Sequence, residues 1–136
     1  MTVYLDTSSL VKLYVDEVDS PAVLDLVTRA TTLTTSTVAY AEARAAFARL
    51  RKTRSISPVA AAKAASQLDA DWSGYVAIDV TRDMSLRAGR LADRFGLRGF
   101  DAIHLASFEL VLERADDDVA FSSGDAALSK AAKRLG

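Results

Sequence analysis

Short apolar segments alternate with longer amphipathic segments along most of this chain. The short segments are rich in β-branched and aliphatic residues, and they predict strands over 3–5, 32–35, 76–80 and 119–121. The longer segments carry apolar residues three and four positions apart, the spacing that places side chains on one face of a helix. Because strands and helices alternate, we expect an α/β fold with a parallel sheet, right-handed crossovers and helices on both faces.

Residues that start or stop helices mark the ends of the longer segments. Ser20-Pro21 and Ser57-Pro58 each suit an N-cap followed by proline at the first helical position. Asp83 is expected to cap a later helix, which Gly96 ends. Ser36 or Thr37 suits the cap of the third helix. The predicted helices cover about 8–15, 20–30, 37–53, 57–72, 83–95, 101–112 and 126–134.

The composition narrows the class of protein. A length of 136 residues fits one domain, 1–136, and a hydrophobic content of 50% suffices for a core without a metal or disulfide. The absence of cysteine excludes disulfide scaffolds, cysteine–zinc sites and thiol nucleophiles. The start lacks a basic segment followed by an apolar one, and no window is apolar enough to span a bilayer, so we expect a soluble cytoplasmic protein. With a net charge of −1, any nucleic-acid partner would have to bind through local patches or a metal.

Four acidic residues stand at positions that suggest a site. Asp6 ends the first predicted strand, where open α/β sheets bind ligands. Glu42 lies on the apolar side of its helix and has no basic residue three or four positions away. Asp101 begins the most apolar helix, and Asp125 follows a strand and a Ser/Gly turn. Each acid alone also fits a simpler role, either at a helix start or as a partly exposed helix residue.

Taken together, the four acids predict a metal site. The ends of the first and last predicted strands open at the same edge of a parallel sheet, and the helix at Asp101 begins there. Four carboxylates that converge without a cation repel one another and resist ionising together. An all-oxygen cluster suits Mg²⁺ or Mn²⁺, which activates water and stabilises an in-line phosphoryl displacement.

A family resemblance rests on four parts of the sequence. They are YLDTSSLVKLY at 4–14, Glu42 in an early helix, RGFDAIHLA at 98–106 and FSSGD at 121–125. In this order and at this separation they resemble the PIN-domain nucleases, and more closely the VapC-like toxins of bacterial toxin–antitoxin pairs. The resemblance covers essentially the whole chain and implies a three-layer α/β/α sandwich with a short, mostly parallel sheet. Four strands are expected; the family usually adds an edge strand, and this chain stops soon after its last predicted helix, which leaves a fifth strand open.

The resemblance also implies an activity and the residues that perform it. It implies a Mg²⁺-dependent endoribonuclease, with Mn²⁺ as a possible substitute, in which metal-activated water hydrolyses RNA. Asp6 and Asp101 would ligate the metal directly. Glu42 and Asp125 would complete the acidic cluster through waters or a second metal.

Further expectations concern two hydroxyl residues and the partners. Ser8 and Ser123 resemble the hydroxyl positions that orient ligands or waters, and the family often has Thr where Ser123 stands. The implied partners are an RNA substrate, a VapB-like antitoxin that holds the nuclease inactive, and a second copy in a homodimer. No membrane partner is implied.

Basic residues offer weaker candidates for RNA contact. Arg87, Arg90 and Arg94 form a stripe that could bind phosphates, although a solvated helix face is the simpler interpretation. A second group closes the third predicted helix, where positive charge already suits the helix dipole. It comprises Arg49, Arg51, Lys52 and Arg54.

His104, the only histidine, lies one turn from Asp101. We expect it to be structural or to orient a ligand, because metal-bound water already supplies the nucleophile.

Two other classes of protein also place acids at the ends of parallel strands, but this chain lacks the residues that they need. A receiver domain needs an acidic pair after its first strand, which is missing here, and a Lys after its last strand, where this chain has Asp125. A haloacid-type phosphatase needs an Asp two residues beyond Asp6, where this chain has Ser8. The remaining alternative is a catalytically silent PIN-fold module that binds RNA or protein, against which the presence of all four acids argues.

Overall fold

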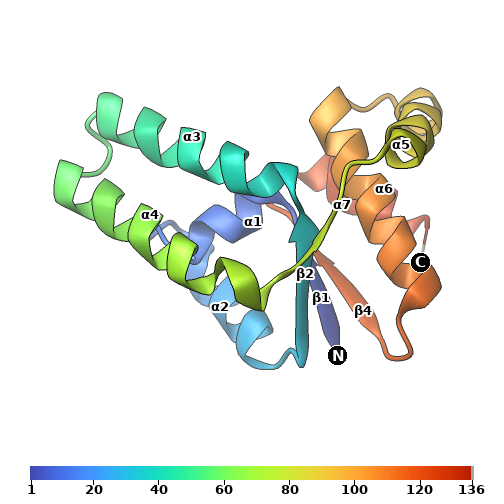
Figure 1. The fold of residues 1–136 in the computed structure, drawn as a ribbon, viewed down its shortest axis with the longest axis horizontal. Helices are drawn as coiled ribbons and strands as arrows, with labels where there is room; N and C mark the ends of the chain where they lie inside the picture. The colour runs from blue at the N-terminus through green and yellow to red at the C-terminus, as the bar shows by residue number, and fades with distance from the viewer. Residues whose placement is uncertain (136) are drawn as a thin grey trace.

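The computed structural model describes residues 1–135 and confirms the predicted α/β fold with a parallel sheet. The four strands found in this part of the chain pair in the order β3-β2-β1-β4, all parallel. The strands are β1 (Thr2–Leu5), β2 (Thr32–Ser36), β3 (Val76–Ile78) and β4 (Val119–Ser122). Helices cover both faces of the sheet, which gives the three layers of the expected sandwich (Figure 1).

The central strand β1 separates two hydrophobic cores. Because side chains alternate along a strand, Val3 and Leu5 enter one core and Tyr4 enters the other. The first core is covered by α1 (Thr7–Lys12), α2 (Ser20–Thr28), α3 (Val38–Lys52) and α4 (Pro58–Asp71). The second is covered by α5 (Arg82–Phe95), α6 (Gly99–Arg114) and α7 (Ala126–Lys133). The two faces of β1 therefore pack against two separate groups of helices.

The helix ends are partly as predicted. Ser57 caps α4, because its hydroxyl accepts a hydrogen bond from the Ala60 amide at 3.0 Å. Gly96 ends α5 with a φ of +67°, in the left-handed region that favours glycine. The predicted cap at Asp83 is wrong: the Thr81 hydroxyl accepts the hydrogen bond from the Met84 amide, and Asp83 lies within the first turn.

Other predicted boundaries also shift. The predicted cap at Ser20 is wrong: Asp19 occupies the N-cap position of α2 without a side-chain hydrogen bond, and Ser20 is the first helical residue. The Ser20 hydroxyl instead closes the preceding loop, because it accepts from the Glu17 amide and donates to the Val15 carbonyl. The α1 helix ends at Lys12 rather than at 15, and β3 ends at 78 rather than at 80. The α6 helix begins at Gly99, so Asp101 belongs to its first turn instead of starting it.

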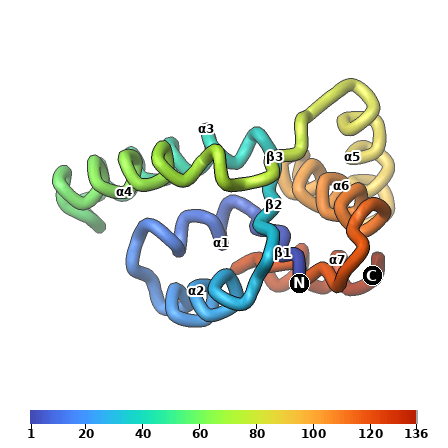
Figure 2. The backbone as a smooth tube through the Cα atoms, turned by 60° about the horizontal axis from the view of Figure 1, so that its bottom comes forward, coloured from blue at the N-terminus to red at the C-terminus, as the bar shows by residue number. Residues whose placement is uncertain are grey.

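The α3 and α4 helices form a hairpin that projects past the sheet (Figures 1 and 2). A short 3₁₀ helix (Trp72–Gly74) then leads into β3. Near the base of the hairpin, Tyr40 donates a hydrogen bond to Asp69, and Arg44 pairs with the same carboxylate at 3.5 Å. Among residues 1–135, no helix combines the length and the apolar character needed to cross a membrane.

Candidate active site

Asp6 lies at the carboxyl end of β1 and is held by three donors. Its Oδ1 accepts hydrogen bonds from the Ser8 hydroxyl at 2.7 Å and from the Ser9 amide at 3.0 Å. Its Oδ2 accepts one from the Ser123 hydroxyl at 2.5 Å. The side chain is only 4% exposed and also caps α1. Both hydroxyl residues singled out in the sequence therefore contact the same carboxylate.

The loop after β4 is hydrogen-bonded to the start of α1. The Gly124 amide donates to the Ser8 hydroxyl at 2.8 Å. A Cβ at Gly124 would lie 2.8 Å from Nζ of Lys12 and 3.3 Å from the Ser8 oxygen, so a side chain there would force a shift. Asp125 caps α7 by accepting from the Leu128 amide at 2.9 Å through Oδ1. These contacts bring Asp125 to the strand end that carries Asp6.

Glu42 reaches the same edge from α3. Its Oε1 accepts a hydrogen bond from the Thr7 hydroxyl at 2.5 Å and lies 3.0 Å from Nε2 of His104. Burial works to raise the pKa of Glu42, but the hydrogen bonds from His104 and Thr7 outweigh it and leave the pKa below its ordinary value. Glu42 has no partner on its own helix, as predicted. Its partners are Thr7 on α1 and His104 on α6.

Asp101 has no hydrogen bond or ion pair with any other side chain among residues 1–135. Burial raises the pKa of Asp101, and repulsion from Asp125, Asp6 and Glu42 raises it further, against an opposing effect that His104 exerts only when its ring is protonated. Asp101 thus experiences the charge of each of the other three acids singled out in the sequence. Asp101 is the member whose charge is least compensated by the protein.

The donor set fits a hydrated divalent cation better than a closed metal cage. Within residues 1–135, no three acidic, histidine or cysteine side chains are placed to hold an ion by themselves. Asp101, however, offers two carboxylate oxygens that no described residue occupies. Mg²⁺ prefers oxygen ligands, keeps several waters and commonly uses one or two carboxylates. The chemistry of the residues therefore suits Mg²⁺ or Mn²⁺ with water completing the coordination.

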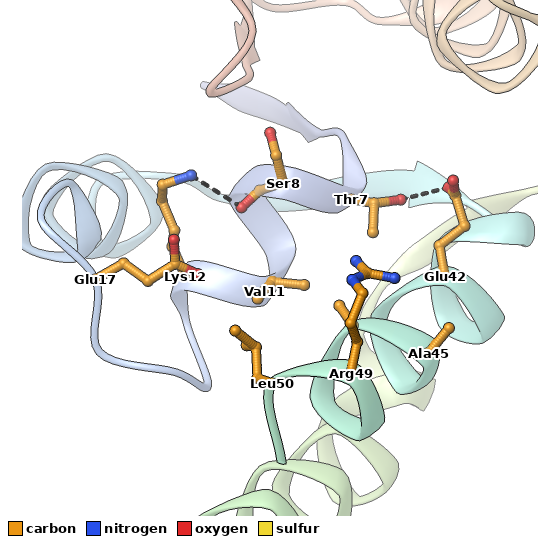
Figure 3. A pocket seen from close by; sticks show the side chains of 10 residues that line it. Thr7, Ser8, Val11, Lys12, Glu17, Glu42, Ala45, Arg49 and Leu50 are labelled. Atoms are coloured by element: carbon orange, nitrogen blue, oxygen red, sulfur yellow. Dashed lines mark hydrogen bonds between the residues drawn. The ribbon is translucent and has the colours of Figure 1, made fainter. Parts of the chain in front are cut away.

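A pocket of about 500 Å³ lies between α1 and α3, and Glu42 is the one of the four site acids that lines it (Figure 3). Thr7 and Glu42 line one part of it, and Arg49 lies two helical turns beyond Glu42 and points into it. Arg49 forms no ion pair with the part of the chain that the structure describes. Lys12 lines the other side and donates to the Ser8 carbonyl at 3.2 Å. Arg49 belongs to the second group of basic residues that the sequence offered for RNA contact. Lys12 and Thr7 were not predicted as site residues, although both lie within the motif around Asp6.

The arginine stripe on α5 does not act as a unit. Arg87 pairs with Glu109 at 3.1 Å and with Glu113 at 2.8 Å, both on α6. At 1.5 Å per residue, these partners lie about 12–18 Å along α6 from Asp101. Arg94 places its guanidinium 4.7 Å from the centre of the Phe95 ring. Arg87 therefore joins α5 to α6, which speaks against its use for RNA, whereas Arg90 has no ion pair within residues 1–135.

Comparison with known proteins agrees with this architecture. The sequence model of the PIN-domain family matches residues 3–134, a span that contains all four acids. Two curated relatives from Mycobacterium tuberculosis are named Ribonuclease VapC45 and Ribonuclease VapC49. Each is 33% identical to this chain over 105 residues, which is 77% of this chain and 73% of the relative. The chain therefore belongs to the PIN-domain family, in the group that includes these VapC proteins.

Proposed function

We propose that this protein is a Mg²⁺-dependent endoribonuclease, a single domain over 1–136 that acts as the toxin of a toxin–antitoxin pair. The observation that carries the proposal is the negative charge of Asp125, Asp6 and Glu42 around Asp101, which disfavours ionisation of Asp101 and which a bound cation would offset. The names of the two VapC relatives support RNA as the substrate class. Mn²⁺ is expected to substitute, because the donors are all oxygen.

In this proposal the four acids have different tasks. Asp6 and Asp101 would hold the ion directly, with Glu42 and Asp125 acting through waters. The chemistry supplied by the bound ion is activation of water and stabilisation of charge on the transferring phosphoryl group. Asp6 is fixed in place by Ser8 and Ser123, whereas Asp101 has no competing partner among residues 1–135. The lowered pKa of Glu42 keeps that carboxylate ionised, so it can accept a hydrogen bond from water at the site.

The direct test is cleavage of total cellular RNA by the purified protein. We expect discrete fragments with Mg²⁺ or Mn²⁺, none with EDTA, and none from the Asp101→Asn variant with Mg²⁺. Mapping the ends of the fragments would give the cut site. If the wild-type protein binds RNA but cuts none of it in Mg²⁺ or Mn²⁺, the nuclease proposal is wrong and the silent PIN-fold binding module becomes the better description.

We also propose that the RNA strand follows the pocket between α1 and α3. Arg49→Gln should raise KM for an RNA substrate about fivefold, because one solvent-exposed ion pair contributes about 1 kcal/mol. It should leave kcat within about twofold, since Arg49 lies two turns from Glu42. The slope of log KM against log salt should fall by about 0.7, the value for one phosphate contact on a single strand.

Arg51→Gln is the matched control for this prediction. Arg51 lies on the same helix and is exposed, but it does not line the pocket. Its KM and salt slope should stay at the wild-type values. Equal effects of the two substitutions would show that α3 attracts RNA only through general charge, and the proposed path would be wrong.

The remaining partners belong to the same proposal. A VapB-like antitoxin, a homodimer and action in the cytoplasm are what the VapC resemblance implies for this chain. Co-expression with a VapB-like antitoxin, followed by light scattering of the purified complex, would measure the number of copies, and an RNA-cleavage assay of that complex would measure the inhibition. Inhibition of RNA cleavage by that partner is the expected result.

A further inference from the structure

The only histidine of the chain is buried between a tyrosine and the acid site. His104 lies on α6 and is 2% exposed. Its Nδ1 lies 2.8 Å from the hydroxyl of Tyr4, a β1 residue with 0% exposure. Its Nε2 lies 3.0 Å from Oε1 of Glu42 and 3.0 Å from the hydroxyl of Thr7. Both ring nitrogens therefore have partners, one in the core and one in the candidate active site.

The direction of these hydrogen bonds follows from the chemistry of the partners. The hydroxyl group of a tyrosine keeps its proton at neutral pH, because its ordinary pKa is about 10. The buried Tyr4 hydroxyl needs an acceptor for that proton, and the unprotonated Nδ1 of a neutral His104 would supply one at 2.8 Å. A neutral imidazole that accepts at Nδ1 carries its own proton on Nε2. That N–H faces Glu42, whose ionised carboxylate can only accept.

We propose that His104 is a positioning residue for Glu42, and that Tyr4 sets the histidine tautomer that makes this possible. The Nε2–H group, together with the Thr7 hydroxyl, holds Oε1 of Glu42. No hydrogen bond from residues 1–135 occupies Oε2, which is left to serve the acid cluster. Thr7 directly follows Asp6, so the same arrangement ties Glu42 to the neighbouring candidate ligand. The benefit to metal binding rests on the proposed function, whereas the tautomer does not.

The tautomer can be read directly, because a protein with one histidine gives one set of imidazole signals in a long-range ¹H–¹⁵N correlation spectrum. We expect the wild-type protein to show the Nε2–H tautomer. Tyr4→Phe should change the Nδ1 shift and mix the tautomers. Tyr14→Phe is the matched control, because it removes a partly buried phenol that bonds to Tyr75 at 2.6 Å and to Asp71 at 2.8 Å, away from His104. A wild-type Nδ1–H tautomer, or a Tyr4→Phe spectrum identical to wild type, would overturn the proposal.

Metal binding without RNA tests the positioning of Glu42 separately. His104→Leu keeps an apolar volume but has no donor, so Mn²⁺ affinity measured by electron paramagnetic resonance should fall about 10–100-fold. His104→Gln returns an N–H donor and should restore affinity to within about threefold of wild type. Melting curves of both variants establish that they are folded. Equal losses of affinity in the two folded variants would overturn the positioning role.

The two measurements also distinguish this inference from the proposed function. A wild-type protein that binds no Mn²⁺ would count against the metal-dependent nuclease and would overturn any role of His104 in metal binding. The tautomer spectra would still decide whether Tyr4 directs His104 toward Glu42. Mn²⁺ binding that His104→Leu weakens and His104→Gln restores, combined with no RNA cleavage, would instead support the positioning role and overturn only the nuclease.

Discussion

Asp101→Asn should abolish RNA cleavage and at the same time raise the melting temperature of the metal-free protein. Cleavage should fall at least about a thousandfold, because the charge stabilisation that a metal ion supplies is several kcal/mol, and each 1.36 kcal/mol is a factor of ten. The gain in stability follows from removing a carboxylate that is repelled by Asp125, Asp6 and Glu42. The melting temperature of a domain of this size rises by about 4 °C for each kcal/mol of added stability, so the gain can be measured directly.

The pH dependence of this gain has a definite sign. The pKa of Asp101 is raised in the folded state above its unfolded value, so the folded protein is penalised at any pH above the folded pKa. The penalty shrinks as the pH falls and is gone below the unfolded pKa, about 3.9 for Asp. The difference in melting temperature between Asp101→Asn and wild type should therefore be largest near neutral pH and should close in acid.

Calorimetric scans in EDTA and in Mg²⁺ would check both parts of the prediction. Mg²⁺ should stabilise the wild-type protein and have little effect on Asp101→Asn. Asp93→Asn is a suitable control, because Asp93 is an exposed acid on α5. A lower melting temperature for Asp101→Asn than for wild type in EDTA would mean that repulsion does not dominate at this carboxylate.

Asp6→Ala should also abolish cleavage, but it should destabilise the protein strongly. Asp6 is buried and accepts from the Ser8 hydroxyl, the Ser9 amide and the Ser123 hydroxyl. Losing a helix cap costs about 1 kcal/mol, and leaving buried donors without acceptors adds more, so we expect the free energy of unfolding to fall by about 2–4 kcal/mol. Urea unfolding of the metal-free protein would measure this loss.

Asp125→Ala provides the graded comparison for Asp6→Ala. Asp125 caps α7 through one hydrogen bond to the Leu128 amide, so its replacement should cost only about 1 kcal/mol of unfolding free energy. If the two substitutions cost the same, the three donors around Asp6 would contribute little, and the fixed position that we assign to this carboxylate would be wrong. The opposite signs expected for Asp6 and Asp101 would distinguish a carboxylate held by three protein donors from one that no described side chain pairs with.

The general arrangement was open to prediction because it rests on local patterns. Short β-branched segments that alternate with amphipathic ones specify a parallel α/β sheet, and the end of β1 fixes where Asp6 lies. Helix boundaries were predicted correctly where a single residue determines the helix end, as at Ser57 and Gly96. They failed where two cap residues stand close together, because Thr81 and Asp83 are both suitable and only the backbone geometry selects Thr81.

The details of the site depend on contacts between distant parts of the chain. The ring of His104 meets Tyr4 and Thr7 across 100 and 97 positions, and no local pattern indicates such a meeting. The same limit applies to Arg87, which looked like one member of a stripe on its own helix. Its partners, Glu109 and Glu113, come from α6, so its role became visible only once α5 and α6 were packed together.

The pairing of β1 with β4 also has a consequence for biosynthesis. The Asp6–Ser123 hydrogen bond joins residues 117 positions apart. At a synthesis rate of about 5–20 residues per second, Asp6 leaves the ribosome's catalytic centre about 6–23 s before Ser123 is added. Throughout that interval the first strand lacks its β4 neighbour and Asp6 lacks one of its three donors. A chain with the activity we propose would thus remain harmless to the messenger RNA that encodes it until translation of its last segment.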